Sequence, residues 1–457
     1  MSSGSATGGR EHAADPFLGE GQTYGAVTGA ISTITLDHPG QRRWLILFAC
    51  ALALLGLFAI SLSYLLIAGV GIWGNNIPVT WGFDIINYVW WIGIGNAGTL
   101  ISALLLMLRQ TWRNAINRMA EAMTLMAAVC AAIYPVIHLG RPWYFYWNLP
   151  YPNTMLLWPQ FRSPLFWDAM AIMIYLTTSL LFWYIGLIPD LATMRDRART
   201  RFRRQAYGVF ALGWRGSSRH WARWRQAYVT IAACAVPLVV AVHSGVGLLF
   251  AASIEPGWHG TIQPPFFVFG AAFSGFAVVA MIAVTVRHAF GIDGIVTAGH
   301  LDMLGKAMLG TGLATAYGYL MELFTTWYGG ESFEQALMLE RLGGVYAWSF
   351  WGVILCNVVV IQTLWFRAVR RNSLALFTIG LGVAAGMWFE RFMIIVITLH
   401  HDFLPSSSHL YTPSFWDLST FAGSVGLFLT AMLLFIRYVP VVSIFEVREM
   451  AVPDRSS

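Results

Sequence analysis

Charged residues are scarce in this chain, and their scarcity decides its class. Only 11% of the 457 residues are charged, whereas 57% are hydrophobic, and the mean hydropathy is +0.61. A soluble domain carries about 25% charged residues. Most of the chain must therefore lie in lipid, which predicts an all-α polytopic membrane protein.

Cysteine is also rare, and its spacing argues against a metal centre. Cys50, Cys130, Cys234 and Cys356 stand alone in four apolar runs, with no CxxC pair and no CxxCH haem-attachment signature. A b-type haem needs two His side chains that face each other within the bilayer, and only His243 lies deep in an apolar run. We therefore expect no metal site, no haem and no iron–sulfur cluster in this chain.

We expect no secretory signal peptide, because residues 1–41 contain no apolar stretch of the required kind. We interpret residues 1–42 as a polar cytoplasmic tail that is extended or docks on a partner. Residues 43–440 form the transmembrane domain, with an Arg-rich cytoplasmic loop over 190–225, and residues 441–457 form a second cytoplasmic tail.

About ten apolar stretches are each close to the ~20 residues that cross a bilayer as a helix. The predicted spans are Trp44–Val70, Ile85–Leu108, Ile116–Ile137, Leu165–Ile188, Ala227–Ala252, Phe266–Val286, Met303–Trp327, Val345–Phe366, Leu374–Leu399 and Phe415–Tyr438.

Basic residues gather in the connections on one side of these spans. They are Arg42, Arg43, Arg109, Arg113, Arg118, the arginines between 195 and 225, Arg287, Lys306, Arg367, Arg370, Arg371 and Arg437. The positive-inside rule places that side in the cytoplasm, with both termini. We interpret the net charge of +6 as an orientation signal that also meets anionic lipid, not as a nucleic-acid-binding surface.

One connection combines ionisable and aromatic side chains at the opposite side. His138 ends one predicted span and Asp168 opens the next, and the segment between them is rich in Trp, Tyr and Pro. Ionisable groups at such depths usually mark function. A His and a carboxylate could accept the two protons of a quinol. The ring would then lie against Trp143, Tyr144, Tyr146 and Trp147.

Further ionisable residues fall at the same side or deeper. Glu255, His259 and Glu322 lie near outer span ends, whereas His243 and the pair Glu390–Arg391 lie deeper. Adjacent residues on a helix do not face each other, so Glu390 and Arg391 each need a partner elsewhere. We expect Asp168 to pair with Arg391, and His243 or Glu322 to pair with Glu390.

Two spans open alike, with SPLFWD at 163–168 and TPSFWD at 412–417. Ordinary helix capping explains both openings, since Ser or Thr caps a helix and an early acid suits its dipole. Only a proton partner for Asp168 would distinguish it from Asp417.

Several segments together resemble the NrfD-like membrane subunits of polysulfide-reductase type, from about Trp44 to the C-terminus. They are HLGRPW at 138–143, SPLFWD at 163–168, PGWH at 256–259, ERF at 390–392 and HHDFLP at 400–405. Within this family the chain is most similar to the quinol-oxidising subunits of bacterial alternative complex III.

The resemblance implies two four-helix bundles with flanking helices, in a bacterial inner membrane, and a quinol site near the periplasmic face. The quinol, expected to be menaquinone, would be bound by His138, Asp168, Arg141, Arg391, His259 and Glu255. Electrons would pass to a periplasmic iron–sulfur subunit and then to haem c subunits, beside a paralogous NrfD-like subunit. His243, Glu322 and Glu390 would contribute to a proton path.

One departure puts proton movement in question. Relatives commonly carry an acid shortly after the His of the 227–252 span, where this chain has Leu248 and Leu249, and an acid appears instead at Glu255. Three alternatives stay open: a quinone-reducing subunit, a non-catalytic paralogue, and a secondary transporter with charged groups near broken helices.

Overall fold

All of the regular elements in this computed structural model are helices, over the residues that it describes, 16–148, 164–401 and 405–451. The long helices are α2 (Gln41–Ala68), α3 (Gly82–Met107), α4 (Asn117–Ile137), α5 (Pro164–Arg197), α7 (Ser218–Ala251), α8 (Gln263–Phe290), α9 (Ala298–Gly329), α13 (Ser373–Phe392) and α14 (Phe415–Tyr438). One more crossing is a broken helix made of α11 (Ala347–Val353), the π-helix η4 (Ile354–Val359) and η5 (Val360–Trp365).

Short helices connect these long ones or cover their ends. They are α1 (Tyr24–Leu36), η1 (Val70–Ile72), η2 (Thr111–Ala115), η3 (Pro142–Asn148), α6 (Arg201–Phe210), α10 (Ser332–Gly343), α12 (Arg367–Arg371), the π-helix η6 (Met393–Ile397), η7 (Pro405–Ser407) and α15 (Ile444–Arg448).

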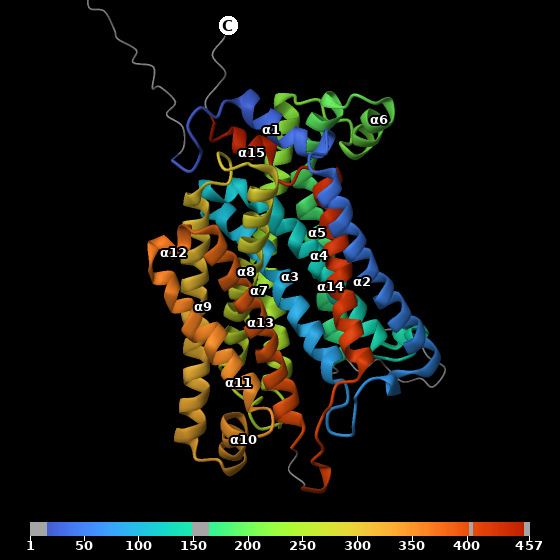
Figure 1. Cartoon of the computed structure of the whole chain (residues 1–457), viewed down its shortest axis with the longest axis vertical. Helices are drawn as coiled ribbons and strands as arrows, with labels where there is room; N and C mark the ends of the chain where they lie inside the picture. Colours follow the sequence, from blue (N-terminus) through green and yellow to red (C-terminus); the bar gives the residue numbers. More distant parts are fainter. Residues whose placement is uncertain (1–15, 149–163, 402–404, 452–457) are drawn as a thin grey trace, which may run out of the picture.

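Nine helical segments of the described chain are long and apolar enough to cross a membrane, which confirms the predicted class of polytopic helical membrane protein. The predicted span 303–327 corresponds to α9, which has 32 residues and packs against α8. It is not among the nine because its sequence is more polar. Nevertheless, α9 extends beside the others for much of the length of the molecule (Figure 1).

The long helices form two bundles of four. In the first, α3, α4, α5 and α7 contact one another in a ring, and in the second α8, α9, the α11–η5 segment and α13 do the same. The bundles meet where α8 packs against α3 and α7, and the pair α2 and α14 flanks the first bundle. This is the arrangement that the family resemblance implied.

The two ends of the molecule differ in what covers them. Helices α1, α6 and α15 lie at one end of the molecule, which we call the α15 end (Figure 1). Helix α10 lies at the opposite end, which we call the α10 end. Because consecutive long helices run in opposite directions, the Arg-rich connection 190–225 falls at the α15 end. His138, Asp168 and His259 fall at the α10 end.

The N-terminal segment differs from the extended or partner-bound tail that we expected. Residues 24–36 form helix α1, which packs against α5, α14 and α15 of the same chain. Val27, Ile31 and Ile34 are buried in this contact, and Arg197 donates a hydrogen bond of 2.6 Å to Ser32 Oγ. Apolar residues at helical spacing thus attach α1 to the α15 end.

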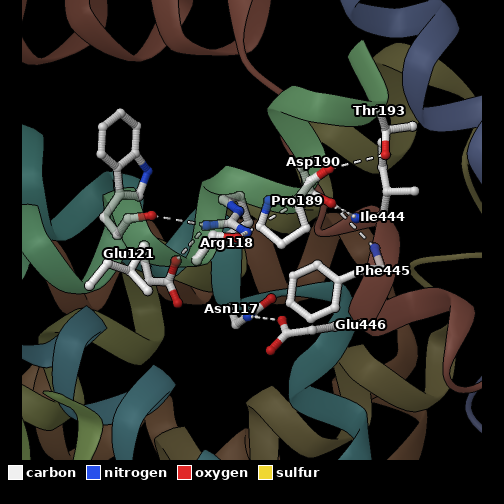
Figure 2. A network of polar contacts seen from close by, with 12 residues as sticks. Asn117, Arg118, Glu121, Pro189, Asp190, Thr193, Ile444, Phe445 and Glu446 are labelled. Carbon is white, nitrogen blue, oxygen red and sulfur yellow. Dashed lines mark hydrogen bonds and ion pairs between the residues drawn. The ribbon is translucent and has the colours of Figure 1, made fainter. Parts of the chain in front are cut away.

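A buried ionic network joins the C-terminal helix α15 to the first bundle (Figure 2). Arg118 donates to Glu121 and to Asp190, both at 3.1 Å, and the other oxygen of Asp190 accepts the backbone N–H groups of Ile444 and Phe445. Glu446 in turn accepts hydrogen bonds from Arg113 at 2.5 Å and from Asn117. The first turn of α15 is therefore bound through charges rather than through apolar packing alone.

This network corrects the interpretation of Arg113 and Arg118 as loop cations. Both guanidinium groups are buried, and three carboxylates surround them: Glu121, Asp190 and Glu446. The carboxylates come from distant parts of the chain, so sequence spacing did not reveal the pairing. Their positive charge is therefore compensated by carboxylates inside the protein.

We expect the free energy of unfolding to depend strongly on Glu446. Replacing Glu446 by Ala leaves Arg113 buried without its carboxylate, which should cost about 3–5 kcal/mol. The control Glu449→Ala removes an exposed carboxylate three residues away and should change stability by less than about 0.5 kcal/mol. Denaturant unfolding of the detergent-solubilised chains measures both, and equal losses would contradict the network's role.

Candidate functional site

Four polar side chains from three helices meet at the α10 end of the first bundle. Asp84 and Tyr88 lie four residues apart on α3 and therefore on the same face of that helix. His138 is the C-terminal cap of α4, and Asp168 lies near the start of α5. We call this group the His138 cluster.

His138 is held by a carboxylate that our sequence analysis did not include. Its Nδ1 lies 3.1 Å from Asp84 Oδ2, and both side chains are almost completely buried. The ring of Trp81 covers the imidazole with ring centroids 5.4 Å apart. A carboxylate at Nδ1 favours the tautomer with hydrogen on that nitrogen, which leaves Nε2 as a proton acceptor.

Asp168 also has a specific partner. The Tyr88 hydroxyl donates a hydrogen bond of 2.6 Å to Asp168 Oδ2. Asp168 is half-buried and close enough to His138 for a Coulombic interaction. The two predicted proton acceptors therefore belong to one cluster.

The repeated helix opening is now resolved into two different roles. Asp417 Oδ2 accepts the backbone N–H groups of Ser414 at 2.7 Å and of Gly74 at 2.8 Å, within a capping box at the start of α14. It is thus a structural cap. Asp168 instead accepts a hydrogen bond from the Tyr88 hydroxyl and lies within Coulombic range of His138, and His138 is the proton partner that distinguishes it from Asp417.

The predicted partner of Arg391 was wrong. Arg391 Nη1 lies 2.8 Å from Oε1 of its neighbour Glu390, and its guanidinium group lies 4.4 Å from the centre of the Phe267 ring. Both charged side chains are buried. The long side chains bend toward each other although they begin on different sides of α13. Asp168 is bound by Tyr88 instead.

Glu390 belongs to a second polar group, in the second bundle. The hydroxyl of Tyr319 on α9 donates to Glu390, and Asn357 Nδ2 donates to that hydroxyl at 3.0 Å. Asn357 lies in the π-helix η4, and the π-helix η6 directly follows α13. Turns of π-helix inside α-helices are frequent at functional sites. We call Tyr319, Asn357, Glu390 and Arg391 the Glu390 group.

The two partners expected for Glu390 occupy neighbouring positions but do not pair with it. Glu322 accepts a hydrogen bond of 2.7 Å from Arg341 of α10. His243 is buried on α7 and interacts electrostatically with Arg391. Glu322 lies within Coulombic range of Glu390, one turn beyond Tyr319 on α9. His243 and Glu322, the other two residues of the predicted proton path, therefore lie near the Glu390 group.

His259 and Glu322 line a separate cavity of about 220 Å³ at the α10 end of the second bundle. His259 Nδ1 lies 3.4 Å from Glu334 Oε1, which also accepts the Gly257 backbone N–H at 2.7 Å. Glu255 is half-buried at the start of the same turn. Neither His259 nor Glu255 contributes to the pairs of the His138 cluster.

The aromatic connection after α4 is described only in part. Trp143, Tyr144 and Tyr146 are exposed on η3, and Arg141, which precedes them, is exposed as well. The Trp147 side chain, residues 149–163 and the family segment at 402–404 lie outside the described residues. Within the described ranges, no group of three or more His, Cys, Asp or Glu side chains is arranged to hold a metal ion.

Asp84 and Tyr88 are the members of the cluster that sequence reasoning missed. The predicted span began at Ile85, and an acid just before a helix is ordinarily explained by the helix dipole. The sequence signal that could have revealed them is their spacing of four residues, which puts both on one face of α3. That face lies at the same end of the helices as His138.

The fold thus defines a class of protein: a helical membrane protein that has paired ionisable groups at one end of each of its two bundles. The chain belongs to the NrfD polysulphide reductase family, whose pattern matches residues 71–400. It is 26% identical over 352 residues to a putative dimethyl sulfoxide reductase membrane subunit of Halobacterium salinarum, covering 73% of this chain and 75% of that protein. It is 23% identical over 395 residues to a subunit of the selenate reductase of Mesobacillus selenatarsenatis, covering 79% and 86%.

The pairing of Glu390 with Arg391 generates a test by double substitution. Arg391→Gln leaves the Glu390 carboxylate buried and should cost about 3–5 kcal/mol of stability. Glu390→Gln in the same chain removes that charge, so the double variant should recover much of the loss. Unfolding free energies of the four chains in the cycle measure the coupling, and strictly additive losses would show that the two residues do not interact.

Proposed function

We propose that this chain is the quinol-oxidising membrane subunit of a multi-subunit oxidoreductase. The observation that carries the proposal is the His138 cluster, in which two proton acceptors each have a second polar group that positions them. A quinol loses two protons and two electrons when it becomes a quinone. Two acceptors in one cluster match that stoichiometry.

In this mechanism His138 Nε2 takes the proton of one quinol hydroxyl, while Asp84 at Nδ1 stabilises the imidazolium that forms. Asp168 takes the second proton, and the Tyr88 hydroxyl stabilises its carboxylate beforehand. The two electrons leave to a redox centre in a partner protein. Arg141, Trp143 and the neighbouring aromatic residues would contact the quinol at the mouth of the site.

The Glu390 group supports a proton path as a further part of the proposal. Tyr319 of α9 donates a hydrogen bond to the buried Glu390. Glu322 lies one turn further along α9 and lines the His259 cavity. A proton could therefore pass between Glu390 and this cavity along α9. His243 would extend this path into α7. Glu255, close to His259, would take the place of the acid that the family resemblance leads us to expect shortly after the His of α7.

The names of the relatives bear on the direction of electron flow. A membrane subunit that serves a reductase would supply electrons, and oxidation of quinol is a source of them. The finer assignment to alternative complex III, with a periplasmic iron–sulfur subunit, haem c subunits, a paralogous membrane subunit and menaquinone, rests on the motif resemblance. The same half-reaction at the His138 cluster serves either type of complex.

The proposed orientation rests on the distribution of arginine. The α15 end carries the Arg-rich connection, and the positive-inside rule assigns that end to the cytoplasm of a bacterial inner membrane. The His138 cluster would then face the periplasm. Protons from quinol would be released on that side.

The most direct prediction concerns Asp168. We expect Asp168→Asn to lower quinol-dependent reduction of the partner's redox centres by about 10²–10⁴-fold, the usual contribution of a positioned proton acceptor. The complex should still assemble, because asparagine can accept the Tyr88 hydrogen bond. Stopped-flow reduction of the purified complex measures the rate.

Asp417→Asn is the matched control, because Asp417 occupies the same position in the repeated helix opening and accepts backbone N–H groups there. An amide oxygen can still accept those groups, so the rate should fall far less than in Asp168→Asn, although Asp417 lies within Coulombic range of Asp84. Unchanged turnover in Asp168→Asn would contradict the proposal and favour a non-catalytic paralogue.

Asp84 offers a second test, as a positioning residue for His138. An Asn at this position can accept from Nδ1 but cannot neutralise an imidazolium. We therefore expect Asp84→Asn to lower kcat while KM for quinol stays close to the wild-type value. Steady-state kinetics over a range of quinol concentrations separates the two constants. A change confined to KM would assign Asp84 to binding and not to proton transfer.

A further inference from the structure

The Arg-rich connection contains a helix that lies where the membrane surface should be. The hydroxyl of Tyr207 on α6 donates to the Tyr438 carbonyl at the end of α14, at 2.9 Å. The Tyr184 hydroxyl on α5 donates to the Phe210 carbonyl at 2.8 Å. The first bond ties α6 to the end of α14 and the second ties it to α5. Figure 1 shows α6 projecting sideways at the α15 end.

The outer face of α6 is apolar and exposed. Phe202, Val209 and Phe210 are 79%, 71% and 58% exposed, and their spacing of seven and eight residues places them on one side of the helix. Arg201, at the start of the helix, flanks this side and is also exposed. An apolar stripe bordered by arginine is typical of helices that lie in the plane of a membrane surface.

The structure has a cationic cavity of about 150 Å³ at the same end of the molecule. Its lining residues lie outside α6, but the side chain of one of them, Arg195, packs next to Gly208 of α6. Arg195, Arg215 and Arg448 line it, together with Trp214 and Asp196. Arg195 is already bound to Asp196 at 2.8 Å and to the Trp214 carbonyl at 2.9 Å. Two further positive charges at the cavity are therefore available to a ligand.

Those two charges come from Arg215 and Arg448. Both residues are exposed, and neither forms an ion pair with a carboxylate in the part of the chain that the structure describes. Arg448 lies over the ring of Tyr24, 5.1 Å from its centre, which restricts where its guanidinium group points. Guanidinium groups match the geometry of a phosphate through paired hydrogen bonds.

We propose that this cavity binds the phosphate headgroup of an anionic phospholipid, with α6 lying in the adjacent lipid surface. Two observations favour a lipid as the source of the phosphate. The cavity adjoins a helix whose exposed apolar face needs acyl chains around it, and the aromatic residues Trp214 and Trp221 at its wall are of the type that lies at the lipid headgroups. The lipid would join the 190–225 connection to α15.

Native mass spectrometry of the full chain in neutral detergent tests this proposal. The probes are phosphatidylglycerol and phosphatidylcholine with identical acyl chains, and we expect the wild-type chain to bind phosphatidylglycerol more tightly. Each arginine at an anionic surface strengthens binding about fivefold, so Arg215→Gln with Arg448→Gln should weaken phosphatidylglycerol binding roughly 25-fold. Phosphatidylcholine binding should not change.

The control is Arg219→Gln, which removes the same charge four residues from Arg215, outside the cavity. It should bind phosphatidylglycerol like the wild-type chain. Thermal unfolding of each variant checks that it is folded; if the double variant is not, Arg215→Gln alone should weaken binding about fivefold. Equal binding of the two lipids, or equal effects of the cavity and control variants, would overturn the proposal. Displacement of the lipid by millimolar inorganic phosphate would instead identify a site for a soluble anion.

Discussion

The structure depends on one constraint: an ionisable side chain inside a bilayer is costly unless another group compensates it. The described part of this chain meets the constraint by pairing. Asp84 is paired with His138, Asp168 with Tyr88, Glu390 with Arg391 and Tyr319, and Arg118 with Glu121 and Asp190. Except for Glu390 and Arg391, which are neighbours on α13, each pair joins different helices or neighbouring turns. The contacts that compensate charge therefore also set the positions of the helices.

We assign these pairs to a functional or a structural group according to whether their proton-accepting atoms are already occupied by other groups of the protein. At the α15 end, Asp190 is occupied by Arg118 and by the backbone of α15 (Figure 2). Glu446 is occupied by Arg113 in the same network. They hold the C-terminal helix in place. At the α10 end, Asp84 binds Nδ1 of His138, no residue that the structure describes forms a hydrogen bond with Nε2, and Asp168 is half-buried. That difference is why we assign chemistry to the His138 cluster and stability to the network at Arg118.

Hydropathy and charge were sufficient to predict the helical class, most spans, and the common location of His138 and Asp168, because these depend on local composition. Pairing was not predictable in the same way. Asp84 resembled an ordinary acid at a helix start, and Arg113 resembled a loop cation, until distant segments supplied their partners. For Glu390 and Arg391 the helical-neighbour rule failed, since long side chains can bend far enough to meet. Such contacts depend on tertiary packing, which a single sequence does not display.

Photolabelling of the intact complex with an azido-quinone, followed by peptide mapping, tests most directly whether the His138 cluster binds the quinol. If it does, the label should fall on the connection between α4 and α5 and on the first turns of α3 and α5, and excess unlabelled quinol should remove it. Labelling confined to α9 and α10 around the His259 cavity, or spread evenly over the lipid-facing helices, would contradict the central claim.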